Sequence, residues 1–349
     1  MFVKLVVWLC FLSIILSQVS GLCSEQTDCG SCTQASEGLE VCCWNATKNS
    51  CLPSLLGVCH IGGTRLSYNC PTELPKFVYT DDFGRSKALP YIAAAYGTTS
   101  TEAQQCLTNT LPGARVYRQY FASPCANGTC SATLSYSMYD QAIVVSFRGA
   151  EGEGQFLQAA TDLLNDEKLP FPTGGNVYHV YRNAFYTFWN EVGLEKGIKY
   201  LKNLYPSYEF WAFGHSLGSG MASLTSSYVV KSGLFSSEKV KMVTTGQTRV
   251  GDIKYAKAHD NLVPYTYRIV NINDMITKLP TKSYPDLEDS YHSRFEVWYP
   301  NGMVKGSKFI ICNQAEQSSC SASSNDTMLP VHNSYFNVSI NTWVGTGCT

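Results

Sequence analysis

The sequence has few charged residues and no excess of either sign. Of its 349 residues, 26 are Lys or Arg and 27 are Asp or Glu, so the charged fraction is 15% and the formal net charge is −1. An average soluble domain has about 25% charged residues, and a nucleic-acid-binding protein normally carries a basic excess. The composition therefore argues against a nucleic-acid partner. The hydrophobic content of 44% argues against a disordered chain.

Long apolar runs are also scarce, and the only one lies at the N-terminus. Lys4 precedes an apolar stretch over residues 5–16, and small residues that suit cleavage after Gly21 follow it. This order is typical of a secretory signal peptide. A membrane anchor is the alternative, but twelve residues are short for a span of about 20. We therefore expect residues 1–21 to be removed, the chain to be secreted and extracellular, and no segment to cross a membrane.

Cysteine, in contrast, is abundant. Loss of residues 1–21 would remove one of the 15 cysteines, and the even number left fits a fully disulfide-bonded protein in an oxidising compartment. Eight cysteines lie between Cys23 and Cys70 among few large apolar residues, so disulfides must hold this region together. Their pairing stays open among about a hundred possibilities. The spacing of Cys29 and Cys32 also suits zinc, which secretion makes the weaker interpretation.

These features predict a signal peptide at 1–21, a cysteine-rich module at 22–72 and a larger domain at 73–349. In a secreted chain, Asn-x-Ser/Thr sequons are possible glycan sites. They occur at Asn45, Asn127, Asn325 and Asn337.

In the larger region, strand-like and helix-like patterns alternate. Apolar segments typical of strands cover residues 141–147, 208–213, 241–245, 265–272, 295–299 and 308–312, and helical patterns cover 183–204 and 221–231. This alternation predicts an α/β fold with a mostly parallel central sheet covered by helices on both faces.

A GHSLG pentapeptide at residues 214–218 follows one of these strands and precedes a helix that is rich in small residues. A G-x-S-x-G sequence between a strand and a helix is typical of a nucleophile elbow. The glycines let strand and helix approach closely around a strained serine. The backbone N–H of Leu217, at the helix N-terminus, can then stabilise an oxyanion. The alternative is a glycine-rich loop with a solvated serine; the context favours Ser216 as a nucleophile.

The chain order of an α/β hydrolase is serine, acid, histidine. Asp274 follows the strand at 265–272, where the carboxyl end of a parallel strand presents catalytic groups. Four other aspartates are rivals: Asp252, which resembles a turn or cap residue, and Asp260, Asp286 and Asp289. Two histidines follow, His292 and His332, and spacing alone does not decide between them.

Six motifs follow one another along the larger region: VVSFRG (144–149), FGHSLG (213–218), TTGQTRVGD (244–252), RIVNINDMITKLP (268–280), YHSRFEVWY (291–299) and VHNSYF (331–336). With these motifs in this order, the chain resembles the class 3 lipases of the fungal type, which are α/β hydrolases, from about residue 79 to the C-terminus.

This resemblance implies a Ser216–Asp274–His332 triad and leaves His292 a structural role. It implies that the backbone N–H groups of Ala150 and Leu217 hold the oxyanion. The family usually has Ser or Thr where this chain has Ala150, so one hydroxyl is missing here. The resemblance also implies disulfides between Cys312 and Cys320 and between Cys106 and Cys348, which leaves Cys125 with Cys130.

A lid segment is expected at residues 151–160, just after the FRG sequence. It begins Glu-Gly-Glu-Gly-Gln, so it is polar and glycine-rich where family lids are often apolar, and strong activation at a lipid surface is not expected.

The leading hypothesis is a secreted carboxylic-ester hydrolase, a triacylglycerol lipase that acts on a lipid or ester substrate through an acyl-enzyme. It needs no cofactor and no metal. One alternative is a lipid-binding or carrier protein on a lipase fold with little turnover, and another is an esterase of short soluble esters. The cysteine-rich module could also serve to dock the hydrolase to an unknown partner.

Overall fold

The computed structural model describes residues 22–54, 58–60, 63–126, 128–165, 167–281, 290–323 and 328–349. These residues form two compact units. One contains the chain up to Glu73 together with Glu316–Ser319, and the other contains Leu74–Ala315 and Cys320–Thr349. The predicted signal peptide at 1–21 lies outside the described residues.

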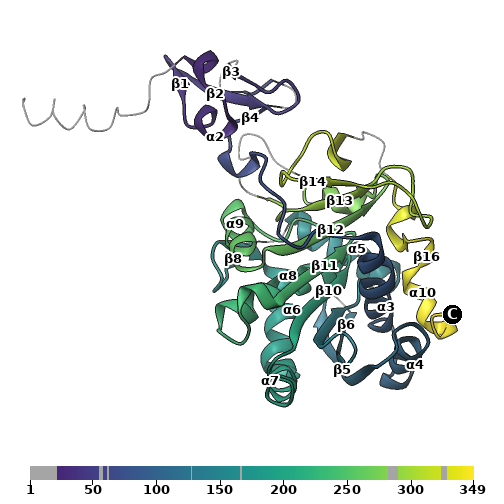
Figure 1. Ribbon diagram of the computed structural model, residues 1–349. Helices are drawn as coiled ribbons and strands as arrows, with labels where there is room; N and C mark the ends of the chain where they lie inside the picture. Colours follow the sequence, from purple (N-terminus) through teal and green to yellow (C-terminus); the bar gives the residue numbers. More distant parts are fainter. Residues whose placement is uncertain are drawn as a thin grey trace, which may run out of the picture. The chain divides into compact units, whose positions relative to one another are not determined.

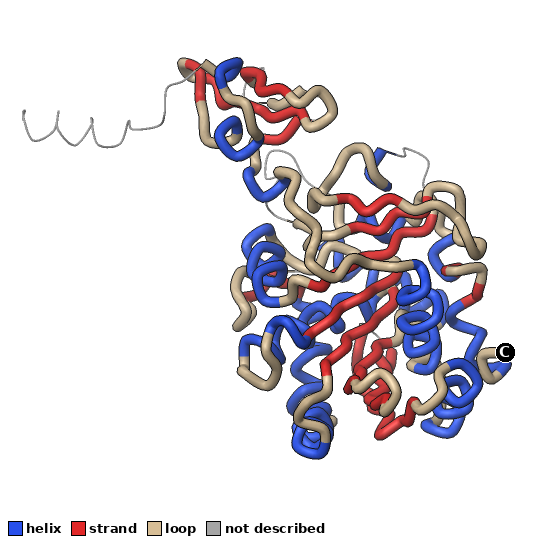
Figure 2. Tube along the Cα trace, viewed as in Figure 1, coloured by secondary structure: helices blue, strands red, loops and turns tan. Residues whose placement is uncertain are grey.

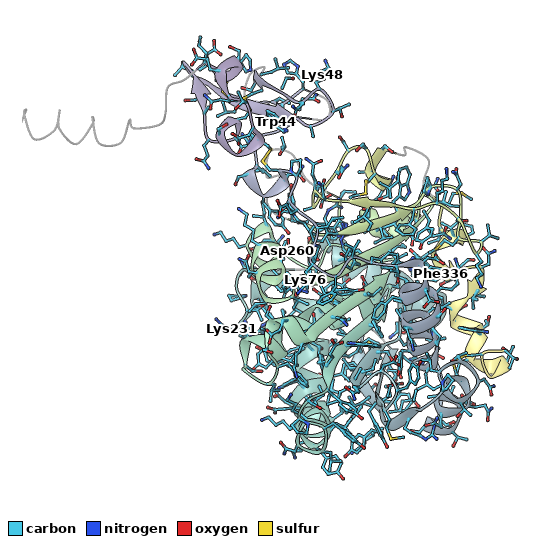
Figure 3. The ribbon with its side chains drawn as sticks, in the orientation of Figure 1. Trp44, Lys48, Lys76, Lys231, Asp260 and Phe336 are labelled. Atoms are coloured by element: carbon cyan, nitrogen blue, oxygen red, sulfur yellow. A yellow bond between two sulfur atoms is a disulfide. The ribbon has the colours of Figure 1, made fainter. Side chains whose placement is uncertain are left out.

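The first unit, here called the cysteine-rich unit, is a small antiparallel sheet held by disulfides. Its elements are η1 (Cys23–Glu25), α2 (Cys29–Cys32), β1 (Ser36–Glu37), β2 (Glu40–Asn45), β3 (Ser50–Pro53), β4 (Gly63–Thr64) and η2 (Ser67–Asn69). Strand β2 pairs with the other three strands, and its Trp44 side chain is buried (Figure 3). All eight cysteines are paired, as Cys23–Cys42, Cys29–Cys70, Cys32–Cys51 and Cys43–Cys59. Both cysteines of the CxxC sequence are therefore committed to disulfides and not to zinc.

The second unit, here called the catalytic unit, is built around an eight-stranded sheet (Figure 1). The order across the sheet is β14-β13-β12-β11-β10-β7-β6-β5. The five central strands from β13 to β7 are parallel, and β14, β6 and β5 run antiparallel to their neighbours. The strands are β5 (Ala114–Cys125), β6 (Gly128–Ser137), β7 (Ala142–Phe147), β10 (Glu209–His215), β11 (Val240–Thr245), β12 (Tyr265–Asn271), β13 (Glu296–Tyr299) and β14 (Ile310–Cys312).

Helices and short strands complete this unit. The helices are η3 (Phe83–Ala88), α3 (Leu89–Ala94), α4 (Ser100–Thr110), α5 (Gly152–Asn165), α6 (His179–Tyr186), η4 (Thr187–Glu191), α7 (Leu194–Leu204), α8 (Leu217–Lys231), η5 (Ser237–Lys239), α9 (Ile253–Leu262), η6 (Met275–Lys278), η7 (Ser321–Ser323), η8 (Pro330–Asn333), α10 (Ile340–Trp343) and η9 (Val344–Thr346). Two short pairs lie outside the main sheet, β8 (Lys168–Pro170) with β9 (Asn176–Tyr178) and β15 (Ser334–Tyr335) with β16 (Val338–Ser339).

Alternate residues of the central strands face two separate apolar clusters, one on each side of the sheet. Phe210 and Ala212 of β10 belong to the cluster that includes residues of α6, α7 and α8, whereas Trp211 and Phe213 belong to the cluster that includes residues of α3, α4 and α10. Helices lie on both sides of the strands (Figure 2). The period of two along β10 explains why its sequence is apolar throughout: both faces of a mostly parallel sheet are covered.

All six expected strands are confirmed, as β7, β10, β11, β12, β13 and β14. The segment expected to be helical at 183–204 is helical except at Val192 and Gly193, but it is divided among α6, η4 and α7. Gly193, with φ +84°, separates η4 from α7. The long hairpin of β5 and β6 was not predicted.

The two disulfides implied by the resemblance are present, as Cys106–Cys348 and Cys312–Cys320, and so is the remaining pair, Cys125–Cys130. Among the described residues, no helix has both the length and the apolar character that a membrane span requires.

Candidate active site

Ser216 stands in the tight turn between β10 and α8. Its backbone has φ 53° and ψ −125°, a conformation that non-glycine residues adopt only when the surrounding structure enforces it. A Cβ at Gly214 would lie 2.4 Å from the carbonyl oxygen of Gly218, and one at Gly218 would lie 2.4 Å from that of Phe147. The two glycines therefore permit the close approach of strand and helix that was expected from the GHSLG sequence.

Two further side chains complete a hydrogen-bonded chain with this serine. His332 Nε2 lies 2.8 Å from Ser216 Oγ, and His332 Nδ1 lies 2.8 Å from Asp274 Oδ2. An ionised carboxylate only accepts hydrogen bonds, so Nδ1 carries the proton and Nε2 accepts from the serine hydroxyl. This is the arrangement in which an imidazole can remove the serine proton.

Asp274 is held in its ionised form by its surroundings. Burial alone would raise its pKa, but attraction to His332 and hydrogen bonds from His332, Tyr335 and the Ile276 N–H outweigh burial, so the pKa lies below its usual value. The Tyr335 hydroxyl donates to Oδ2 at 2.7 Å and the Ile276 N–H to Oδ1 at 3.0 Å. The carboxylate is thus fixed by three donors and points at Nδ1 of the histidine.

The rival acids and base have other tasks or lie outside the described residues. Asp252 caps α9 by accepting from the Tyr255 N–H, as the sequence suggested, and Asp260 accepts from the Arg294 N–H. His292 Nε2 lies 2.8 Å from the carbonyl oxygen of Thr277, to which it can only donate. Asp286 and Asp289 lie outside the described residues.

The sequence pointed to neither of the two residues that support the histidine. Tyr335 is fully buried, and burial raises its pKa well above the ordinary value, so it stays a hydrogen-bond donor to Asp274. Gly246, with φ +62°, directly follows β11 and lies against the imidazole, and a Cβ there would lie 2.7 Å from His332 Cε1. The spacing of Tyr335 three residues after His332 is the sequence signal that could have found it.

A second histidine ring packs on the first. The His215 and His332 ring centroids are 4.7 Å apart. Burial, together with the nearby His332, lowers the pKa of His215 to about 3. His215 therefore stays neutral beside an imidazole that becomes charged when it accepts the serine proton.

A pocket opens beside the nucleophile. Its lining residues are Ala150, Phe156, Ala159, Ala160, Leu163, Tyr181, Ser216, Leu217, Thr248, Ile276 and Leu279. The Leu217 N–H, the first of α8, has no partner within the helix, and among the described residues the Ala150 N–H donates to no backbone or side-chain acceptor. Both residues of the expected oxyanion hole therefore line the pocket, and within the described part of the chain neither backbone N–H has a hydrogen-bond acceptor.

One group of potential metal ligands occurs among the described residues, namely Glu296, Cys312 and Cys320. The two cysteines form a disulfide, and Glu296 accepts a hydrogen bond from the Ser321 N–H at 2.9 Å. Their ligand atoms are already committed, so this group is structural.

The parallel sheet, the strained serine after a central strand and the order of Ser, Asp and His along the chain define a serine hydrolase of the α/β-hydrolase fold. Solved fungal lipases share this fold. The triacylglyceride lipase of Rhizomucor miehei matches with a TM-score of 0.64 and 22% identity over 78% of this chain and 98% of that chain, and lipase II of Rhizopus niveus with a TM-score of 0.62 over 72% and 93%.

Sequence relatives identify the family. The family model for "Lipase (class 3)" matches residues 144–284. The protein "Lipase ZK262.3" of Caenorhabditis elegans is 30% identical over 287 residues, which cover 73% of this chain and 79% of the relative. "Secreted mono- and diacylglycerol lipase 3" of Gibberella zeae is 26% identical over 60% of this chain and 69% of its own length. The chain belongs to the class 3 lipase family and is a serine ester hydrolase.

Proposed function

We propose that this chain is a secreted lipase that hydrolyses glyceride esters through an acyl-enzyme, with Ser216 as nucleophile, His332 as base and Asp274 as the acid that orients it. The observation that carries the proposal is the hydrogen-bonded chain from Ser216 Oγ through both ring nitrogens of His332 to Asp274, beside a pocket of mostly apolar lining.

In the first step, Ser216 Oγ attacks the ester carbonyl while His332 Nε2 takes the hydroxyl proton. The N–H groups of Ala150 and Leu217 hold the oxyanion, and His332 then gives the proton to the leaving alcohol. In the second step, a water molecule attacks the carbonyl of the acyl-enzyme while His332 Nε2 takes a proton from it. His332 then returns the proton to Ser216 Oγ, and the fatty acid is released. Because the chain has alanine at 150, only the two backbone N–H groups are assigned to the oxyanion.

Helix α5 covers the nucleophile and has to move before an ester can bind. Phe156, Ala159, Ala160 and Leu163 line the pocket from this helix, and the Phe156 ring centroid is 6.1 Å from that of His332. Only 6% of Ser216 is exposed. The free space is about 20 Å³, which is room for about one water molecule. The covering helix is longer than the expected 151–160 segment, and its inner face is apolar, so its displacement exposes apolar surface that a lipid phase can cover.

Secretion is part of the proposal. It is supported by the predicted signal peptide, by seven disulfides and by a relative whose name describes it as secreted. Of the two sequon asparagines that are described, Asn337 is exposed in the turn between β15 and β16, whereas Asn45 is 6% exposed. Asn337 is therefore the better placed of the two to carry a glycan.

The test is the hydrolysis of two substrates, an emulsified long-chain triglyceride and a soluble short-chain ester, by wild-type protein and Ser216→Ala. We expect the variant to lose both activities by about 10⁴-fold or more. Ser232→Ala, which removes a serine hydroxyl at the far end of α8, serves as the matched control and should keep wild-type rates.

Three outcomes separate the hypotheses. Ser216-dependent hydrolysis of the emulsion supports a triacylglycerol lipase. Ser216-dependent hydrolysis of the soluble ester alone indicates an esterase. Equal rates for wild type and Ser216→Ala on both substrates contradict the proposal and favour a lipid carrier.

A further inference from the structure

The pocket beside Ser216 contains one polar feature that the mechanism does not use. Tyr181 of α6 and Thr248, in the segment after β11, both line it, and their hydroxyl groups are hydrogen-bonded to each other. Apart from the nucleophile, every other lining residue is apolar. Tyr181 is completely buried and Thr248 is 2% exposed.

The two hydroxyl groups of this pair have one more proton to donate than they have acceptors. Each hydroxyl has one proton to donate, and the bond between the two oxygens uses one of these protons. Among the described residues, no other group accepts a hydrogen bond from either hydroxyl. One O–H therefore remains without an acceptor at a buried position, where such a group normally has a partner. Phenylalanine and valine would fill almost the same space without this cost.

Tyr181 is held in place by tight packing. The Tyr181 ring packs directly over Gly220 of α8, where a Cβ would lie 2.3 Å from Cε1. Burial raises the pKa of Tyr181 above its ordinary value, so the hydroxyl keeps its proton at any working pH. Neither residue belongs to α5, so movement of that helix leaves the pair beside the nucleophile.

We propose that the Tyr181–Thr248 pair is a substrate subsite that donates a hydrogen bond to a second oxygen atom of the substrate, close to the ester that Ser216 attacks. This inference rests on the proposed function and adds to it a preference for esters that carry a second oxygen function over simple alkyl esters. Two sources offer that oxygen, the free hydroxyl of a partial glyceride and the neighbouring ester group of a fuller glyceride.

The test compares three esters of one fatty acid in the same detergent micelles. They are the 1-monoacylglycerol, its diacetyl derivative, in which both free hydroxyls are esterified, and the methyl ester, which has no second oxygen function. The proteins are full-length wild type, Tyr181→Phe and Thr248→Val. Tyr186→Phe, a tyrosine of the same helix that does not line the pocket, is the matched control.

For Tyr181→Phe and Thr248→Val, we expect kcat/KM for the glyceride divided by kcat/KM for the methyl ester to fall about 3- to 10-fold, as for loss of one hydrogen bond. Tyr186→Phe should leave this ratio unchanged. A fall for the monoacylglycerol alone identifies the free hydroxyl as the ligand, and a fall that includes the diacetyl derivative identifies the ester group.

An unchanged ratio in both variants, whatever their absolute rates, overturns the subsite, because a structural role would affect all three esters alike. The thermal midpoints of the two variants show whether either one fails to fold, and each tests the proposal without the other. Ser216→Ala is measured alongside, and if wild type hydrolysed none of the three esters faster than Ser216→Ala, the proposed function would be overturned, and the subsite with it.

Discussion

The two units of this chain use disulfides for different purposes. In the cysteine-rich unit, five of the seven residues of the buried cluster are cysteines, so the covalent bonds are themselves the core. In the catalytic unit, large apolar clusters fill both sides of the sheet, and three disulfides join segments that are already packed. Disulfides therefore take the place of an apolar core in the cysteine-rich unit and reinforce an existing core in the catalytic unit. The reason is size, because a small unit buries too little apolar surface to be stable without cross-links.

The largest effect should follow from removal of one disulfide of the cysteine-rich unit. Cys32 and Cys51 are buried and bonded to each other. Changing both to serine should cost about 2–5 kcal/mol, which is comparable with the whole stability of so small a unit. We expect residues 22–73 to become sensitive to protease while hydrolysis of a soluble ester continues at the wild-type rate. Ser36→Ala is the control, and a parallel loss of activity would show that the units do not fold independently.

A smaller effect is expected from the disulfide that joins α4 to the C-terminus. Cys106 and Cys348 are separated by 242 residues of sequence. Serine at both positions should lower the free energy of unfolding of the catalytic unit by about 2–4 kcal/mol. Because two apolar clusters remain, the unit should still fold and hydrolyse esters at 25 °C, with a lower thermal midpoint by calorimetry. Failure to fold would mean that this unit, too, depends on its disulfides as a core.

The smallest effect is expected for the stability of the catalytic unit at acidic pH. The pKa of Asp274 is lowered in the folded protein, so its contribution to stability is complete above its unfolded pKa of about 4 and is lost as the pH falls through the folded value. The thermal midpoint of the catalytic unit should therefore fall more steeply below about pH 4 in wild type than in Asp274→Asn. The cysteine-rich unit should change less, because its bonds do not titrate and Asp28, whose pKa is also lowered, is exposed to screening solvent. Parallel midpoint curves for wild type and Asp274→Asn would remove Asp274 as the cause.

Local patterns made the central strands and the nucleophile elbow predictable. The strands β7, β10 and β11 have apolar residues on both faces. The glycines around Ser216 are needed because side chains there would clash with neighbouring backbone, and the G-x-S-x-G pattern predicts this requirement. The hairpin of β5 and β6 escaped prediction, because the burial pattern along β5 is irregular and two bulges interrupt its register. The break at Gly193 was missed because the apolar spacing continues across it.

From the residues alone, the number of candidates for the catalytic acid and base could be reduced, but the two residues could not be identified. His292 and His332 both follow Asp274, and only tertiary structure brings His332 within 2.8 Å of both partners; the family resemblance had favoured it. Pairing within the cysteine-rich unit was likewise open, because sequence does not encode which of eight neighbouring sulfurs approach each other. The Tyr181–Thr248 pair joins a helix to a distant loop and leaves no local signal.

The order of strands in the sheet has a consequence for which changes this chain can tolerate. Ser216 follows β10 and Asp274 follows β12, with β11 between them, so two strand spacings of about 5 Å each set their separation. The hydrogen-bonded pairing of the strands, and not any connecting loop, thus sets the distance between Ser216 and Asp274. Insertions in the connecting loops leave that distance unchanged. The residue that follows the middle strand has to lack a side chain, because the His332 ring lies against Gly246. We therefore expect insertions and substitutions to be tolerated in the connecting loops, and any residue other than glycine to be excluded at position 246.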